Sequence, residues 1–188
     1  MKEFIKLKNI SKKYNNNYIF KDFNLSILEN EFVLISGESG KGKTTLLNII
    51  SKLDKVNSGE VIVNGKIGYL FQNFALIENE DIYNNLKLVE KDKDKIIGAL
   101  NKVNLDKHDL KTPIFTLSGG EQQRVAIARL ILQNVDIVLC DEPTGSLDDK
   151  NSNLILEEII KLHKSGKTIL VVSHSNIFDD VATKKIEL

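Results

Sequence analysis

The sequence predicts an α/β fold in which helices flank a mostly parallel sheet. First, short apolar runs bounded by turn residues alternate with amphipathic stretches along the 188 residues. Second, the later runs are apolar at almost every position, which is typical of strands covered on both faces. Third, the segment from about 73 to 117 has no clear strand pattern. It is predicted to be a helical lobe inserted into the α/β core.

Short apolar runs predict strands at Phe4–Ile10, Phe23–Ile27, Phe32–Ser36, Glu60–Val63, Ile67–Phe71, Val135–Cys140 and Thr168–Val172. The Asn64–Gly65 pair is a strong signal for a two-residue hairpin between the two runs that flank it. We therefore expect the early strands to be antiparallel and half-exposed, and to form a β subdomain. Lys184–Leu188 can supply one further short strand.

Helices are predicted at Lys43–Ser51, Asp81–Val89, Lys93–Val103, Gly120–Leu132 and Asn151–Ser165. In the last of these, Leu154, Ile155, Ile159 and Leu162 share one face, and Gly166 is suited to end the helix. Alternation of strands and helices implies right-handed crossovers. A chain of this length is expected to form one domain, residues 1–188.

Composition excludes several classes of protein. Lys plus Arg and Asp plus Glu both number 26, so the net charge is zero and gives no bulk attraction to nucleic acid. Cys140 is the single cysteine, which excludes an intrachain disulfide or a cysteine metal cluster. The first residues alternate charged and apolar types, unlike a secretory signal. Because the apolar runs are far shorter than the ~18 residues of a membrane span, we expect a cytoplasmic protein.

Residues 37–44 fit the pattern G-x-x-x-x-G-K-[ST] between a predicted strand and a predicted helix. The candidate phosphate-binding residues are Gly37, Glu38, Ser39, Gly40, Lys41, Gly42, Lys43, Thr44 and Thr45. Glycines let backbone N–H groups approach phosphate oxygens, and the following helix directs its positive end at them. Lys43 can reach the β- and γ-phosphates, and the Thr44 hydroxyl can bind Mg²⁺. A plain glycine-rich turn is the alternative, but every fixed position of the pattern is present.

The run Ile137–Asp141 is an apolar strand that ends in a carboxylate, and Glu142 follows at once. Asp141 is predicted to hold Mg²⁺ through water beside the phosphate loop. Glu142 is expected to point the other way along the pleat and to orient or deprotonate an attacking water. The alternative is a pair of acids that ends a strand before Pro143, which the phosphate loop makes the weaker explanation.

The run Leu117–Arg124, which reads LSGGEQQR, resembles the LSGGQ signature of ATP-binding cassette (ABC) proteins. Ser118, Gly119 and Gly120 stand at a predicted helix start, where a hydroxyl and free N–H groups form a second anion site. Further residues resemble the family's motifs: Gln72 the Q-loop glutamine, Ser146–Asp148 the D-loop, His174 the switch histidine and Tyr14 the aromatic that stacks on adenine. The resemblance spans about Phe4 to His174.

This resemblance implies a P-loop NTPase core that binds ATP and Mg²⁺. It implies catalytic roles for Glu142, His174 and Gln72, and metal binding by Thr44, Gln72 and Asp141. It also implies a homodimer in which two copies pair head-to-tail and sandwich ATP, the second copy contributing Ser118–Gly120 and Asp148. Tyr18 is an alternative to Tyr14, and His108 and His163 are expected to be ordinary surface histidines.

The resemblance favours the ATP-hydrolysing subunit of a transporter, peripheral on the inner membrane face through a separate permease. The apolar start of the lobe, Asn73–Ile77, suits a partner helix or ordinary lobe core. Two alternatives are a soluble ABC ATPase acting on nucleic acid or translation, and a nucleotide sensor without hydrolysis. Long coiled-coil inserts and zinc modules are absent, which disfavours the first; Glu142 and His174 disfavour the second.

Two stretches, Leu70–Ile77 and Asp141–Asp148, resemble the subgroup that serves lipoprotein release, macrolide export and bacteriocin export. The run FALIEN at residues 74–79 is most similar to the bacteriocin-export branch, so a peptide cargo is expected. The chain departs from the family in two places. Ser175 stands where an acid is frequent, and only 14 residues follow His174, so no C-terminal regulatory domain is expected.

Overall fold

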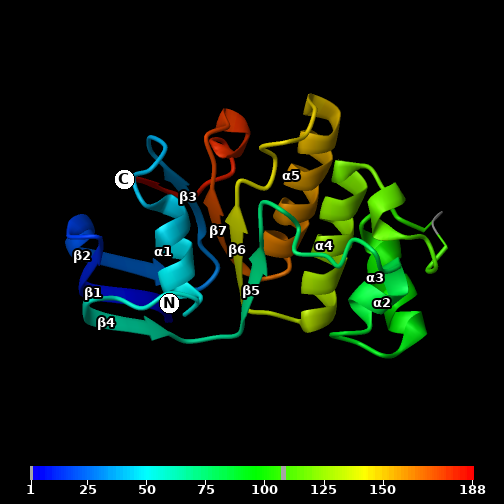
Figure 1. Ribbon diagram of the computed structural model, residues 1–188, viewed down its shortest axis with the longest axis horizontal. Coiled ribbons are helices and arrows are strands. Elements are labelled where there is room, and N and C mark those ends of the chain that lie inside the picture. Colours follow the sequence, from blue (N-terminus) through cyan, green and yellow to red (C-terminus); the bar gives the residue numbers. More distant parts are fainter. Residues whose placement is uncertain (1, 107–108) are drawn as a thin grey trace.

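A computed structural model describes residues 2–106 and 109–188, so His108 lies outside the described part. It contains a five-stranded parallel sheet, a three-stranded antiparallel sheet and flanking helices (Figure 1). The predicted fold class is confirmed.

The parallel sheet consists of β3 (Phe32–Ser36), β5 (Ile67–Leu70), β6 (Ile137–Asp141), β7 (Thr168–Val172) and β8 (Lys184–Glu187). Its strand order is β5-β6-β7-β3-β8, and all neighbouring strands are parallel. The carboxyl ends of these strands therefore share one edge, which is where open α/β sheets place their binding sites.

Each central strand alternates its side chains between two cores. In β3, Phe32 and Leu34 join one core, while Val33 and Ile35 join the other. The same alternation continues in β6 and β7, and all of their residues are buried. Burial on both faces explains why the sequence shows continuous apolar runs here rather than alternation.

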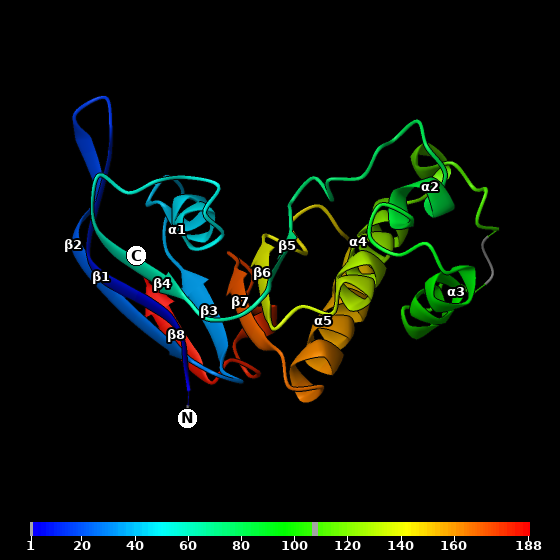
Figure 2. The same ribbon diagram turned by 90° about the horizontal axis from the view of Figure 1, so that it is seen from below.

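The antiparallel sheet consists of β1 (Glu3–Tyr14), β2 (Asn17–Leu28) and β4 (Ser58–Val63), in the order β2-β1-β4. Helix α1 (Lys43–Ile50) packs its buried side chains into one core with β1, β2 and one face of the parallel sheet. Figure 2 shows α1 and the antiparallel strands on one side of the parallel sheet. The lobe and the two long helices lie on the other side.

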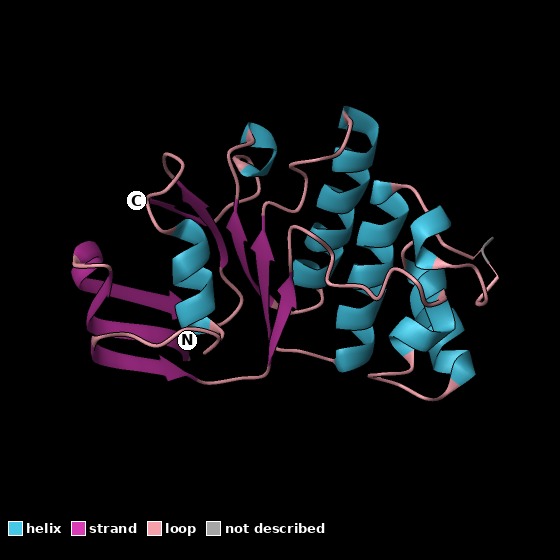
Figure 3. Ribbon diagram, viewed as in Figure 1, coloured by secondary structure: helices cyan, strands magenta, loops and turns pink. Residues whose placement is uncertain are grey.

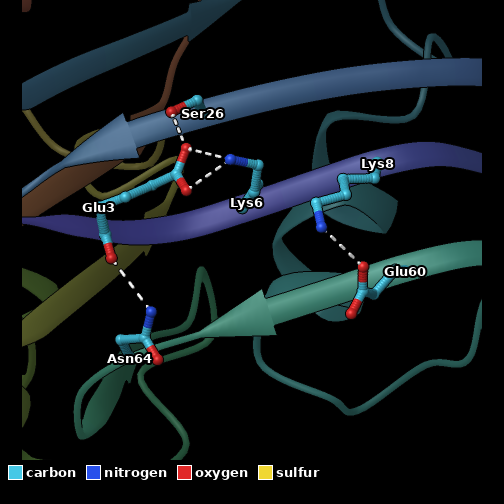
Figure 4. A network of polar contacts seen from close by, with 6 residues as sticks. All are labelled: Glu3, Lys6, Lys8, Ser26, Glu60 and Asn64. Carbon is cyan, nitrogen blue, oxygen red and sulfur yellow. Dashed lines mark hydrogen bonds and ion pairs between the residues drawn. The ribbon is translucent and has the colours of Figure 1, made fainter.

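The predicted hairpin at Asn64–Gly65 is wrong, because β4 and β5 belong to different sheets. Asn64 instead pairs with β1: its N–H donates to the Phe4 carbonyl at 2.8 Å and its side chain donates to the Glu3 carbonyl at 3.1 Å (Figure 4). The chain then crosses to the other sheet, since the Lys66 N–H donates to Asp136 at 2.8 Å, beside β6.

Polar contacts on the outer face of the antiparallel sheet reinforce this pairing (Figure 4). Glu3 accepts hydrogen bonds from Lys6 at 2.8 Å and from Ser26 of β2 at 2.6 Å, and these bonds lower the pKa of its carboxyl. Lys8 and Glu60 form an ion pair across β1 and β4 at 3.0 Å. Because water screens these exposed pairs, they help to fix register more than they add stability.

The hairpin of this sheet joins β1 to β2 through Asn15 and Asn16, whose φ angles are 47° and 67°. Two successive left-handed residues favour a two-residue turn, and asparagine tolerates this conformation better than other residues with a Cβ. The antiparallel β subdomain is therefore confirmed, with a different turn from the predicted one.

Further helical segments are α2 (Ile82–Leu86), α3 (Lys93–Lys102), a 3₁₀ turn (Ile114–Thr116), α4 (Gly119–Gln133) and α5 (Asp149–Lys164). A short 3₁₀ turn, Asn176–Phe178, precedes β8. Figure 3 shows the helices gathered beside the sheet. Helix α2 is shorter than the predicted Asp81–Val89, while α5 ends near Gly166 as expected. Among the described residues, no helix combines the length and apolar character that crossing a bilayer requires.

Candidate nucleotide-binding site

A pocket of about 500 Å³ lies at the carboxyl edge of the parallel sheet. Its lining includes ten residues that the sequence singled out: Ser39, Gly40, Gly42, Lys43, Thr44, Thr45, Gln72, Asp141, Glu142 and His174. Gly145 and Val172 also line it and were not predicted. The loop after β3 and the ends of β5, β6 and β7 therefore meet at one place.

The predicted phosphate loop, residues 37–44, encloses the buried side chain of Lys43. Its Nζ donates to the carbonyls of Gly37 at 2.8 Å and Glu38 at 2.9 Å. Gly42 begins α1 with a φ of 96°, and a Cβ there would clash with the Ile19 side chain of β2. Only glycine fits this position, because both the backbone angle and the space exclude a side chain.

Thr44 and Asp141 face each other across the pocket. The Thr44 hydroxyl donates to Asp141 Oδ1 at 3.1 Å, and the Tyr69 hydroxyl lies 3.4 Å from Oδ2. Burial raises the pKa of Asp141 despite these donors, and burial together with Asp141 raises the pKa of Tyr69. The sequence predictions give Tyr69 no role. Its place in the predicted strand Ile67–Phe71, three residues before Gln72, is the signal that could have identified it.

Glu142 and His174 also line the pocket and lie beside each other. The backbone N–H of His174 donates to Glu142 Oε2 at 3.3 Å, and His174 Nε2 lies 3.5 Å from Oε1. Glu142 has a φ of 46°, so the chain leaves the extended conformation immediately after Asp141. For this reason both carboxylates line one pocket, and the expectation that Glu142 points the other way along the pleat is wrong.

The signature residues do not line this pocket within one chain. Ser118 instead begins α4 in a capping box, in which its N–H donates to Glu121 Oε2 at 2.8 Å and its hydroxyl accepts from the Glu121 N–H. Gly120 packs so closely on α5 that a Cβ would lie 2.5 Å from the Asn151 side chain. The start of α4 is thus fixed and presents Ser118 to solvent.

A second pocket, of about 640 Å³, lies between the segments that follow β5 and β6 and the start of α4. Gln72, Phe74, Gly119 and Leu147 are among its lining residues. Asp148, next to Leu147, caps α5 by accepting hydrogen bonds from the backbone and side chain of Asn151 at 2.8 and 2.9 Å. These bonds lower the pKa of Asp148.

Tyr14 lies outside the 500 Å³ pocket, at the end of β1, and is 46% exposed. Its hydroxyl donates to Asp54, and the ammonium of Lys12 lies 4.5 Å from its ring centroid. The bond to Asp54 raises the pKa of Tyr14. Tyr18, the alternative, is 56% exposed and likewise outside the pocket lining.

Two other sequence predictions concern residues away from the pocket. In the apolar stretch 73–77, Phe74 and Leu76 pack against the lobe core, while Ile77 remains 49% exposed. Phe74 and Leu76 thus agree with the expectation of ordinary core, and the expectation of a partner helix stays a prediction. His163 lies on α5 with its Nε2 3.0 Å from the Asn30 carbonyl and does not line the pocket.

Comparison with known proteins identifies the family. The profile of the ABC transporter family matches residues 20–145, two thirds of the chain. The chain belongs to the ABC transporter family. It is an ATP-binding subunit of a transporter and an ATPase, so the predicted family and enzyme class are confirmed.

Curated ABC relatives match over most of the chain. An uncharacterized ABC transporter ATP-binding protein, MJ0796 of Methanocaldococcus jannaschii, is 39% identical over 90% of this chain and 86% of its own. The phosphonates import ATP-binding protein PhnC of Lactobacillus acidophilus is 37% identical over 93% of this chain and 80% of its own. The macrolide export ATP-binding/permease protein MacB of Campylobacter jejuni is 38% identical over 97% of this chain but 32% of its own length.

A solved ABC cassette has the same fold. The dimeric structure of MJ0796 in a post-hydrolysis state, bound to ADP and Pi, superimposes with a TM-score of 0.88 and 35% identity over 98% of this chain and 94% of that chain. The named importer and exporter relatives have similar sequence identity to this chain, 37% and 38%. Identity therefore does not decide the cargo, which stays a prediction.

Proposed function

We propose that this ABC subunit hydrolyses ATP in the pocket at the carboxyl edge of its parallel sheet and so drives a separate membrane permease. One observation carries the proposal: Lys43, Thr44, Gln72, Asp141, Glu142 and His174 line a single pocket although they come from distant parts of the chain. Lysine and loop amides suit phosphate, and the paired acid and histidine suit a water nucleophile.

The Thr44–Asp141 pair fits Mg²⁺. A hydroxyl and a carboxylate are hard oxygen donors, and the 3.1 Å between them leaves both oxygens facing one small volume. Among the described residues, no group of three or more His, Cys, Asp or Glu side chains forms a denser metal site. Mg²⁺ held here, with Gln72 as an outer ligand, would neutralise charge on the phosphate oxygens of ATP.

The remaining groups would divide the chemistry. Lys43 holds the terminal phosphates, and its bonds to two loop carbonyls already bring its ammonium over the loop. Glu142 accepts a proton from the attacking water, or orients it, and His174 lies beside that carboxylate at 3.5 Å. Tyr14 supplies a ring face for adenine from the edge of the β subdomain.

A head-to-tail homodimer would complete the site. Ser118 is exposed at the positive end of a 15-residue helix, and within one chain it does not line the phosphate pocket. A second copy that places its Ser118, Gly119 and Gly120 over the pocket would add N–H donors to the γ-phosphate. The dimeric state of the MJ0796 cassette supports the pairing of two copies.

The permease and cargo are proposed from the family and the motif resemblance. Relatives are named as ATP-binding proteins of importers and exporters, which supports a membrane permease as the partner that would hold this subunit at the cytoplasmic face. Export of a bacteriocin-type peptide is proposed from the run at residues 74–79. MacB supports export, while PhnC at similar identity defines the competing import function.

Two substitutions test hydrolysis in this pocket. Glu142→Gln should lower the rate of phosphate release by at least ~100-fold and retain ATP binding, because it removes proton acceptance alone. Lys43→Ala should weaken ATP binding itself. Phosphate release and equilibrium binding of ATP measure both effects. Tight ATP binding by Lys43→Ala, or full hydrolysis by Glu142→Gln, contradicts the assignment.

Reconstitution tests the cargo. The subunit and the permease that co-purifies with it would be placed in proteoliposomes with a bacteriocin-type peptide, a macrolide or a phosphonate. ATP-dependent movement of the peptide alone, away from the side that holds the ATPase subunit, is the expected result. Movement of the phosphonate toward the side that holds the ATPase subunit would contradict export.

A further inference from the structure

The loop that follows Gln72 adopts an unfavourable backbone conformation. Phe74 and Ala75 have φ angles of 62° and 49°, so two consecutive residues with side chains are left-handed. A Cβ atom disfavours this conformation, and neither residue is a glycine or asparagine. Something outside the loop must therefore hold it, because such a conformation persists only where the surroundings fix it.

Arg129 of α4 supplies that contact. Its Nη1 donates to the Ala75 carbonyl at 2.5 Å and its Nη2 donates to the Phe74 carbonyl at 2.9 Å. The two donors of one planar guanidinium thus bind the carbonyls of the two left-handed residues, a geometry that lysine cannot reproduce. Within residues 2–106 and 109–188, no carboxylate forms an ion pair with Arg129. Burial lowers its pKa.

The same loop also contacts the beginning of α4. A Cβ on Gly119 would lie 3.9 Å from Phe74 Cζ, and both residues line the second pocket together with Gln72. Arg129 is ten positions beyond Gly119, about 15 Å along the helix axis at 1.5 Å per residue. The loop therefore lies close to α4 at its first turn and is hydrogen-bonded to it at Arg129, four residues before the helix ends.

We propose that Arg129 is a positioning residue that holds the loop after Gln72 in its left-handed turn and fixes it to α4. Gln72, which lines the phosphate pocket, and Ser118, which begins α4, then move as one unit. The effect of this coupling on ATP hydrolysis rests on the proposed function. The two hydrogen bonds of Arg129, called the clamp below, do not require nucleotide. A purely structural role, in which Arg129 stabilises the lobe without setting the loop, is the competing explanation.

A fluorescence experiment without nucleotide tests the clamp. The chain contains no tryptophan, so Ile77→Trp on the exposed side of the loop provides a single reporter. In this background, Arg129→Lys should raise acrylamide quenching about two-fold, because the loop is no longer held by two donors. Adding Ala75→Gly should reverse the change, since glycine adopts the left-handed angle without a Cβ penalty.

Lys66→Met is the matched control. Lys66, just before β5, donates to the carbonyl of Gln133, the last residue of α4, at 2.6 Å. It therefore also joins a cationic side chain to a backbone carbonyl, but it does not bind the loop after Gln72. Its removal should leave the quenching unchanged. Equal quenching in Arg129→Lys and the parent overturns the proposal. So does a double variant, Arg129→Lys with Ala75→Gly, whose quenching is no lower than that of Arg129→Lys alone.

Hydrolysis supplies the second readout. Arg129→Lys should lower kcat about ten-fold through misplacement of Gln72 and Ser118. It should leave KM for ATP within about two-fold, because Lys43 and its loop are untouched. The Ala75→Gly addition should restore most of kcat. A loss that follows only the unfolded fraction overturns the proposal, whereas absence of hydrolysis in the parent overturns the proposed function and leaves the fluorescence result to decide the clamp.

Discussion

At the residue scale, Asp141 is a carboxylate that the fold places where its charge is unfavourable. It is buried at the end of β6, and burial raises its pKa above the ordinary value of 3.8 even though Thr44 and Tyr69 lie within hydrogen-bond distance. Such a group gains by meeting a cation, which is the role proposed for it with Mg²⁺. Lys43, by contrast, satisfies its ammonium on two loop carbonyls until phosphate arrives.

The raised pKa of Asp141 predicts a pH dependence of stability. Above that pKa, the ionised carboxylate costs folded-state free energy; as the pH falls toward 3.8, the folded chain takes up a proton more readily than the unfolded chain. Asp141→Asn should therefore stabilise the protein at about pH 8 in EDTA, and this advantage should shrink at about pH 4.5. Urea unfolding of both proteins at the two pH values measures it, and a constant difference would contradict the prediction.

At the scale of elements, backbone contacts determine how β4 joins β1. The register of the two strands shifts between Lys8 and Ser11, opposite Gly59, whose φ is 94°. A Cβ on Gly59 would lie 2.5 Å from the Asn9 carbonyl oxygen and 2.6 Å from the Ile10 Cα. Since these are backbone atoms, they cannot rotate away, and glycine is required for the strands to approach.

Gly59→Ala should therefore destabilise the protein by at least ~3 kcal/mol, since it combines a backbone clash with a left-handed angle. Gly98→Ala is the matched control, because Gly98 lies inside α3 and an added methyl group would meet no atom within 4 Å apart from its chain neighbours and the nearby backbone of its own helix. It should stabilise the protein by about 0.5–1 kcal/mol through helix propensity. Urea unfolding of both variants checks the opposite signs, and similar effects would refute the account.

At the scale of the whole molecule, the parallel sheet separates two cores and gathers the site at one edge. Lys43 and Thr44 follow β3, while Gln72, Asp141 and His174 lie at or just after the ends of β5, β6 and β7. The start of α4 lies apart from this pocket, joined to it through the loop that Arg129 holds. One copy of the chain therefore presents two separate candidate anion-binding surfaces, which is the physical basis for the proposed dimer.

Ser118→Asp tests that dimer while keeping an N-cap at the start of α4. Aspartate caps a helix as well as serine, but it loses the hydroxyl's 2.7 Å hydrogen bond to Glu121 Oε2 and faces that carboxylate, so stability should fall by about 1 kcal/mol. Its charge would also oppose the γ-phosphate of the partner site. In the Glu142→Gln background, ATP should produce dimers in size-exclusion chromatography, and adding Ser118→Asp should abolish them while ATP binding by the monomer persists. Undiminished dimerisation would exclude a role for Ser118 in the interface.

The class of the fold and most residues of the candidate pocket could be predicted from the sequence. The phosphate loop, the acidic end of β6 and the capping serine of α4 depend on residue types at short spacings, and continuous apolar runs reveal strands buried on both faces. These signals are local, so they can be recognised along the chain.

Features that depend on contacts between residues far apart in the sequence were decided by the tertiary structure. Asn64 binds β1 rather than turning a hairpin, Glu142 leaves the pleat because its backbone is left-handed, and Tyr69 and Arg129 acquire their partners from other elements. For Asn64, Tyr69 and Arg129 the cause is the same, because each side chain binds a backbone carbonyl or a carboxylate that the fold brings near. A partner of this kind outweighs the local preference of the residue, and no spacing along the chain records it.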